Sequence, residues 1–165
     1  MKRIFLLALL TLFLGSCGAS KRSTKTVVIG GSTSTVSSKR ISKVVKHAKT
    51  FEGTRYKYGG TNNRGMDCSG LVYVSFKEQN IDLPRVSRDM ATKGVRLQLN
   101  ETKEGDLVFF RTNKNKRTIN HVGLVVEHKK GVIKFIHSTS SRGVIVSSLE
   151  EKYWKNAFVE VRRMI

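Results

Sequence analysis

One cysteine lies where a helix is expected to begin. Cys68 stands within the segment MDCSG at 66–70, directly ahead of the apolar run LVYVSF at 71–76. A thiol at a helix N-terminus faces the positive end of the helix dipole and unpaired backbone N–H groups, and both favour its thiolate. These residues make Cys68 a candidate nucleophile. The alternative is that Cys68 is a small buried residue that fills space in the core.

A nucleophilic thiol needs a base within hydrogen-bonding reach, and usually a third polar group that orients the base. His121 opens the strand-like run HVGLVVE, and His137 closes the strand-like run VIKFIHS. If these runs are neighbouring antiparallel strands, the two histidines meet at the same sheet edge. The alternative is that each is an exposed residue at a strand end. We expect His47, on a helix among lysines, and His128, in a polar turn, to face solvent.

The first half of the chain predicts helices that could carry the cysteine. Apolar residues recur at helical spacing from Lys39, which indicates a first helix that ends near Gly53. The Gly- and Asn-rich stretch 53–67 indicates a loop, followed by a helix from Cys68 to about residue 79. After a turn at Pro84, we expect a short helix with Ser87 as its N-cap.

The second half of the chain predicts strands that could carry the histidines. Short runs rich in Val, Ile and Phe alternate with polar or glycine turns, at 106–110, 121–127, 132–137 and 144–146. A last run at 157–162 is expected to be an edge or closing strand. Helices followed by a meander of strands predict an α+β fold, with N-terminal helices packed against a five- to six-stranded antiparallel sheet.

The N-terminal residues indicate export. Lys2 and Arg3 precede an apolar run at 4–14, which is followed by the small residues Gly15 and Ser16. This order is typical of a secretory signal. The apolar run is too short for a membrane-spanning helix, which needs about 20 residues.

The end of that signal resembles the lipobox of bacterial lipoproteins, in which the cysteine is acylated. The matching residues are Leu14-Gly15-Ser16-Cys17, so the resemblance implies lipidation at Cys17, and Gly18 after it implies sorting to the outer membrane. The next residues, to 38, are rich in Ser, Thr, Gly and Lys and contain no acid, which indicates a flexible tether. The sequence therefore predicts a signal peptide at 1–16, a lipidated tether at 17–38 and one folded domain at 39–165.

Lipidation leaves the other cysteine without a partner. An exported protein normally uses its cysteines in disulfides, and a free thiol in an oxidising compartment is a liability unless it is used. With Cys17 acylated, Cys68 is the only other cysteine of the chain. The alternatives are a disulfide between Cys17 and Cys68 or simple burial of Cys68.

The chain carries a formal net charge of +19, and 26 of its 31 basic residues lie from Ser38 onward, with all 12 acids. In an exported lipoprotein, the available polyanions are lipid head groups and the carboxylates of the cell wall. The basic stretch with Lys114, Lys116 and Arg117 lacks interleaved aromatics. We therefore predict no nucleic-acid partner, and a solvated basic surface that attracts an anionic substrate in a salt-sensitive way.

Six short motifs in order resemble the NlpC family of papain-like bacterial cell-wall cysteine peptidases. They are Tyr56-Lys57-Tyr58-Gly59-Gly60, Asp67-Cys68-Ser69-Gly70-Leu71-Val72, Leu83-Pro84-Arg85 with Ser87-Arg88, Gly105-Asp106-Leu107-Val108-Phe109-Phe110, His121-Val122-Gly123 and the strand end at His137. The resemblance covers about Ile41 to Arg162 and implies the papain-like NlpC fold. The chain lacks the proline that is common before the Gly105-Asp106 pair, and we expect no separate wall-binding module in it.

The resemblance also implies roles for individual residues. By this resemblance, Cys68 matches the position of the family's nucleophile. His121 matches the general base, and His137 matches the third residue, which orients the base. Tyr56 resembles the tyrosine that lies near the thiol and assists the oxyanion region. The resemblance further implies that the substrate cleft is lined by Asp67, Ser69, Arg85 and Ser87. No metal or cofactor is implied.

These observations predict a lipid-anchored, monomeric peptidoglycan endopeptidase at the periplasmic face of a bacterial outer membrane. By resemblance, the bond is D-glutamyl to diaminopimelate within a stem peptide or D-alanyl to diaminopimelate in a cross-link. One alternative is an amidase or acyltransferase on the same scaffold, and another is a non-catalytic wall-binding lipoprotein. Zinc binding by Cys68, His121 and His137 is a third, although these residues lack local ligand spacing.

Overall fold

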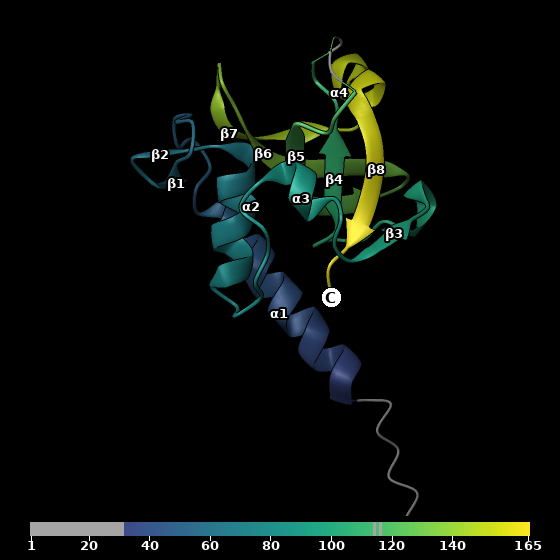
Figure 1. Ribbon diagram of the computed structural model, residues 1–165. Helices are drawn as coiled ribbons and strands as arrows, with labels where there is room; N and C mark the ends of the chain where they lie inside the picture. Colours follow the sequence, from purple (N-terminus) through teal and green to yellow (C-terminus); the bar gives the residue numbers. More distant parts are fainter. Residues whose placement is uncertain (1–31, 114, 116) are drawn as a thin grey trace, which may run out of the picture.

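The computed structural model describes residues 32–113, 115 and 117–165, and its side chains from residue 37 on (Figure 1). The predicted signal peptide, the lipidation site Cys17 and most of the tether lie outside the described residues, as do Lys114 and Lys116. Within the described residues, no helix combines the length and the apolar character that crossing a bilayer requires.

Helix α1 spans Ser32–Lys49. The prediction was wrong at both ends, because it assigned 32–38 to the tether and extended the helix to about Gly53. The buried side chains of Val44, Val45 and Ala48 anchor the helix. Once this anchored part has formed, extending the helix toward its N-terminus costs little, even through Ser and Thr. At its C-terminal end the chain turns away, and Gly53 has a positive φ of 84°.

The main sheet confirms the predicted α+β class. Six antiparallel strands follow the order β3-β8-β4-β5-β6-β7. Their bounds are Val95–Leu97 (β3), Leu107–Phe110 (β4), His121–Lys129 (β5), Val132–Thr139 (β6), Gly143–Ser148 (β7) and Phe158–Arg163 (β8). Figure 1 shows α1 and α2 together on one side of this sheet and α4 near one end of it.

Two strands differ from the prediction. Strand β8 pairs with both β3 and β4, so it lies inside the sheet and is not an edge strand. Strand β3 was not predicted, because three residues, two of them exposed, are too few to give a clear strand pattern. Strand β3 is held by its backbone hydrogen bonds to β8, and this pairing connects residues that are far apart in the sequence.

The remaining elements are short. The predicted loop at 53–67 contains a two-stranded hairpin, β1 (Thr61–Asn62) and β2 (Gly65–Met66). Helix α2 spans Cys68–Lys77, the 3₁₀ helix η1 spans Leu99–Glu101, and the helix α4, which was not predicted, spans Lys152–Ala157. Helix α3 spans Ser87–Met90, and its N-cap is Val86. The predicted capping by Ser87 was wrong, because Ser87 is the first helical residue.

Alternate residues of the sheet face two separate apolar clusters. Leu107 and Phe109 pack into the larger cluster with α1 and α2, whereas Val108 and Phe110 pack into a second cluster with Trp154 of α4. Successive side chains on a strand point to opposite faces, so all four residues of β4 are buried. Burial on both faces holds the sheet in place, and with it the strand ends that carry His121 and His137.

Candidate active site

The candidate nucleophile stands at the start of a capped helix. Asp67 is the N-cap of α2, and its Oδ1 accepts a hydrogen bond from Gly70 N at 2.6 Å. Cys68 is therefore the first helical residue, as the sequence predicted. Its thiol is free, and the residue as a whole is half-buried.

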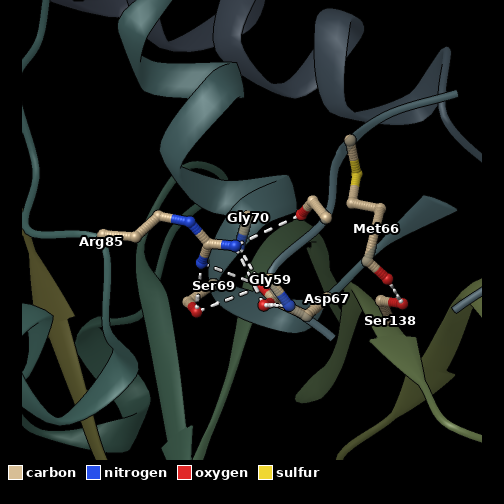
Figure 2. A network of polar contacts seen from close by, with 8 residues as sticks. Gly59, Met66, Asp67, Ser69, Gly70, Arg85 and Ser138 are labelled. Atoms are coloured by element: carbon tan, nitrogen blue, oxygen red, sulfur yellow. Dashed lines mark hydrogen bonds and ion pairs between the residues drawn. The ribbon is translucent and has the colours of Figure 1, made fainter. Parts of the chain in front are cut away.

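An ion pair holds this helix start to the segment that follows α2, and further hydrogen bonds hold it to the preceding loop, as Figure 2 shows. Arg85 donates to both carboxylate oxygens of Asp67, at 3.0 and 2.9 Å, and to Ser69 Oγ at 2.9 Å. Gly59 N donates to Asp67 Oδ2 at 2.8 Å. A Cβ on Gly70 would come within 2.1 Å of the Gly60 carbonyl oxygen, so only glycine fits at this close contact. The network positions the Cys68 backbone against the loop.

The hairpin ahead of the cysteine is tied to the sheet as well. Ser138 Oγ on β6 donates to the Met66 carbonyl oxygen at 2.7 Å (Figure 2). Because Met66 lies two residues before Cys68, this bond joins the thiol's segment to the strand that carries His137.

A cleft of about 410 Å³ opens beside Cys68. It is lined by Tyr56, Cys68, Thr112, Asn120, His121, Ser138, Thr139, Ser140, Ser141, Arg142, Glu151, Tyr153 and Trp154. The four residues expected to line the substrate cleft are not in this set. Asp67, Ser69 and Arg85 are engaged in the network at the helix start, and Ser87 is buried in α3.

The expected meeting of the two histidines is confirmed. Strands β5 and β6 pair antiparallel, and His121 Nε2 lies 2.9 Å from His137 Nδ1. His137 Nε2 in turn lies 3.0 Å from Ser147 Oγ on β7. All three side chains are buried. Trp154 covers the pair, stacked on the His121 ring at 5.2 Å and edge-on to the His137 ring at 4.5 Å.

This chain of contacts determines which nitrogen of His121 can take a proton. In a neutral imidazole one nitrogen donates and the other accepts. If Ser147 accepts from His137 Nε2, then His137 Nδ1 accepts from His121 Nε2, and His121 Nδ1 is left as a free acceptor. If Ser147 donates instead, the hydrogen of His121 sits on Nδ1 and the ring cannot act as a base toward the cleft. The first arrangement is the productive one.

Burial sets the protonation of both histidines. It lowers the pKa of His121 to about 4. The pKa of His137 falls to about 2, mainly through burial and further through the charges of His121 and Arg142. Both rings are therefore neutral at pH 7, which is the state a general base requires.

The thiol differs from the sequence-based expectation. Burial raises the pKa of Cys68 above its ordinary value, and the charge of Asp67 adds to this rise. Backbone N–H groups of Val122, Ser69 and Cys68 itself lower the pKa without offsetting the burial. The helix N-terminus was expected to favour the thiolate. Its backbone donors do act in that direction, but burial outweighs them. Burial also raises the pKa of Tyr56, with a smaller contribution from Cys68, so its phenol stays protonated as a donor.

The other two histidines were expected in solvent, and both have neighbours. His128 lies in β5 and its Nδ1 is 2.6 Å from the Thr102 carbonyl oxygen. The His47 ring packs edge-on to Phe51, with centroids 5.0 Å apart. Among the described residues, no three Cys, His, Asp or Glu side chains are grouped so that they could hold a metal ion.

Sequence reasoning missed Ser147, Arg142 and Trp154. Ser147 faces the same side of the sheet as His137, because β6 pairs with β7 and Ser147 lies opposite Phe135, two residues before His137. The register between these strands is not readable from composition, although the alternation of β7 could have placed Ser147 on that face. Trp154 belongs to a six-residue helix that gave no periodic signal.

A family model and the related proteins all indicate the same family for this chain. The model of the NlpC/P60 family matches residues 53–163. A probable endopeptidase NlpC homolog from Haemophilus influenzae is 41% identical over 114 residues, which cover 68% of this chain and 57% of that protein. A murein DD-endopeptidase MepS/murein LD-carboxypeptidase from Escherichia coli is 36% identical, over 75% of this chain and 63% of its own length. The chain thus spans about three fifths of these relatives.

Solved structures agree on the fold. A crystal structure of an NlpC/P60 family protein from Bacillus cereus superposes with a TM-score of 0.68 at 27% identity, covering 74% of this chain and 39% of that one. The fold expected from the motifs, helices against a five- to six-stranded antiparallel sheet in the NlpC arrangement, is therefore confirmed, with six strands.

Proposed function

The chain belongs to the NlpC/P60 family, and from this premise we propose that it is a cysteine peptidase that hydrolyses amide bonds in the peptides of peptidoglycan. The observation that carries the proposal is the cleft that Cys68 and His121 both line, with His137 hydrogen-bonded to His121 and Ser147 hydrogen-bonded to His137. The names of the relatives, an NlpC endopeptidase homolog and a murein DD-endopeptidase, support the same substrate class.

The proposed reaction proceeds by acyl transfer. The Cys68 thiol gives its proton to His121 Nδ1 while Sγ attacks the carbonyl carbon of the substrate amide. The carbonyl oxygen becomes an oxyanion, which backbone N–H groups at the start of α2 and the Tyr56 phenol stabilise. His121 then returns the proton to the leaving amine nitrogen as the C–N bond breaks, which yields the free amine and an acyl-enzyme.

Water completes the cycle. His121 Nδ1 takes a proton from the water as its oxygen attacks the thioester, and the thiol is released with that proton. Through both halves, His121 Nε2 remains hydrogen-bonded to His137, so the base keeps its orientation. His137 is therefore proposed as the residue that orients His121, and neither metal nor cofactor takes part in any step.

The test is digestion of purified peptidoglycan, with products identified by mass spectrometry. We expect cuts within or between stem peptides from the wild-type protein. Cys68→Ala should lose turnover by about 10³-fold or more, with an unchanged far-UV spectrum and melting transition. Ser75→Ala, which removes a buried hydroxyl on the same helix outside the cleft lining, serves as the matched control. Unchanged muropeptides with a titratable reduced thiol would refute the proposal.

The product masses also separate the competing bonds and enzymes. Cleavage between D-glutamate and diaminopimelate shortens a stem, whereas cleavage of a D-alanyl to diaminopimelate bond opens a cross-link. An amidase would release whole stem peptides from glycan. We propose the endopeptidase and retain both bonds as candidates.

We further propose that the chain is anchored in the envelope through lipid on Cys17, with peptidoglycan as its partner and the periplasmic face of the outer membrane as its site. The proposal rests on the residues Leu14-Gly15-Ser16-Cys17 and on Gly18. We expect the wild-type protein to incorporate labelled palmitate and to sediment with membranes. Cys17→Ala should lose both properties. Full labelling of Cys17→Ala would rule the anchor out.

A further inference from the structure

The cleft contains an arginine that the proposed reaction does not use. Arg142 belongs to the turn 140–142 between β6 and β7 and lines the cleft with Cys68 and His121. It projects from the same hairpin that carries His137 and Ser147. Its position relative to the reacting groups therefore depends on how firmly this turn is held.

The turn is fixed by backbone contacts. Arg142 N donates to Thr139 Oγ1 at 3.1 Å, and Val144 N donates to the Thr54 carbonyl oxygen at 2.8 Å. Gly143 has a φ of 68°, and a Cβ at this position would come within 2.2 Å of the same Thr54 oxygen. The turn thus rests against residues 53–55, and Arg142 starts from a defined backbone position.

The guanidinium of Arg142 is not neutralised by the protein. Arg85 is paired with Asp67, and Arg163 is paired with Asp106 at 2.8 Å. Arg142 is exposed, and within the described residues its side chain has no ion pair or hydrogen bond. The one acid of the cleft lining, Glu151, accepts from Ser148 N through Oε1 and does not pair with Arg142. A positive charge is therefore available in the cleft.

That charge belongs to the same cleft as the proposed reacting groups. Arg142 lines it together with Cys68 and His121, and its guanidinium also contributes to the lowered pKa of His137. A substrate group bound by Arg142 would accordingly lie close to the amide that Cys68 attacks. Guanidinium offers a planar fork of donors that matches a carboxylate in two parallel hydrogen bonds.

We propose that Arg142 is a specificity-determining residue that binds a free carboxylate on the substrate peptide, next to the scissile amide. This inference rests on the proposed function. Both candidate bonds carry such a carboxylate: the D-glutamyl bond has it on the acyl side, and the D-alanyl to diaminopimelate bond has it on the amine side. An amidated peptide would lose this contact.

The test compares matched peptides that differ only by carboxylate against carboxamide, prepared for each side of the scissile bond. Because Arg142 is exposed, we expect the wild-type kcat/KM to favour the carboxylate form by about fivefold, the effect of a solvent-accessible ion pair. The difference should lie mainly in KM and shrink with added salt. Arg142→Gln should cleave both forms at equal rates. Arg64→Gln removes the same charge from an exposed turn outside the cleft, and should keep the preference.

Binding to the Cys68→Ala variant, measured by calorimetry, separates this inference from the proposed function. If wild-type protein cleaves no peptide while Cys68→Ala still prefers the carboxylate form and its Arg142→Gln double variant does not, Arg142 binds carboxylate and the peptidase proposal fails. Equal cleavage and equal binding of both forms by the wild type would overturn the role of Arg142. So would a preference that survives in Arg142→Gln.

Discussion

Replacing Ser147 by alanine removes the last member of the hydrogen-bonded chain behind the base. His137 is fully buried and Ser147 is 4% exposed, so no solvent can replace the hydroxyl. In the productive arrangement, His137 Nε2 would keep a hydrogen without an acceptor, at a cost of about 1–3 kcal/mol. The opposite tautomer avoids this cost, because it leaves only a lone pair unmatched.

The substitution should therefore change activity as well as stability. A shift of about 1.4 kcal/mol toward the unproductive tautomer changes the ratio of the two tautomers about tenfold, so the population of competent enzyme, and with it kcat/KM, falls by up to about tenfold. We expect the free energy of unfolding to fall by about 1–2 kcal/mol, measured by urea denaturation. Ser147→Thr keeps the hydroxyl and should retain most of the activity.

The decisive readout is the tautomer itself. In ¹⁵N spectra of the imidazoles, wild-type His121 should carry its hydrogen on Nε2, and Ser147→Ala should move part of that population to Nδ1. Ser75→Ala controls for the loss of a buried hydroxyl, since its bond to the Leu71 carbonyl oxygen lies within α2. Wild-type turnover and an unchanged imidazole spectrum in Ser147→Ala would refute the reasoning.

Four further outcomes follow from the site. Because the pKa of His121 is about 4 in the fold and about 6.5 in the unfolded chain, stability is fully present above pH 6.5 and falls as the pH drops toward 4, by about 3 kcal/mol from this residue; urea midpoints across this range should show the loss, and His121→Gln should reduce it to the part that the lowered pKa of His137 contributes. The same pKa places the acid limb of kcat/KM near pH 4, and a limb near 6.5 would contradict the burial argument. Trp154→Ala should destabilise by about 3 kcal/mol and move that limb to higher pH, because it admits water to both rings. Arg85→Ala leaves Asp67 without its cation and should lower the free energy of unfolding, measured by thermal denaturation, by about 2 kcal/mol, a value discounted for the partial exposure of the arginine. An unchanged melting temperature would contradict a structural role for this pair.

The sequence predicted best those features that depend on local pattern. The start of α2 at Cys68 followed from one apolar run, and the strands around His121 and His137 followed from runs of branched residues. Their meeting needed one added assumption, antiparallel pairing of adjacent strands, which the short connection between them favours.

Features that depend on distant contacts were missed. Strand β3 exists through β8, and the helix that carries Trp154 is too short to have a period. Asp67 was expected in the cleft, but its carboxylate is used by the helix N-terminus and by a guanidinium 18 residues away. Whether a polar side chain is committed to structure or free for a ligand depends on the partners that the fold supplies.

The protonation of the thiol shows the same dependence on burial. The sequence placed Cys68 at a helix N-terminus, where the dipole lowers the pKa of a thiol by favouring charge. Folding also buries that position, and burial raises the pKa of Cys68 more than the backbone donors lower it. The same burial lowers the pKa of His121 and so keeps the base free of protons over a wide range of pH. The resting site is thus a neutral thiol beside a neutral imidazole. In the proposed mechanism, His137 and Ser147 fix the proton-accepting nitrogen of His121, and the Cys68 thiolate forms as its proton leaves during attack.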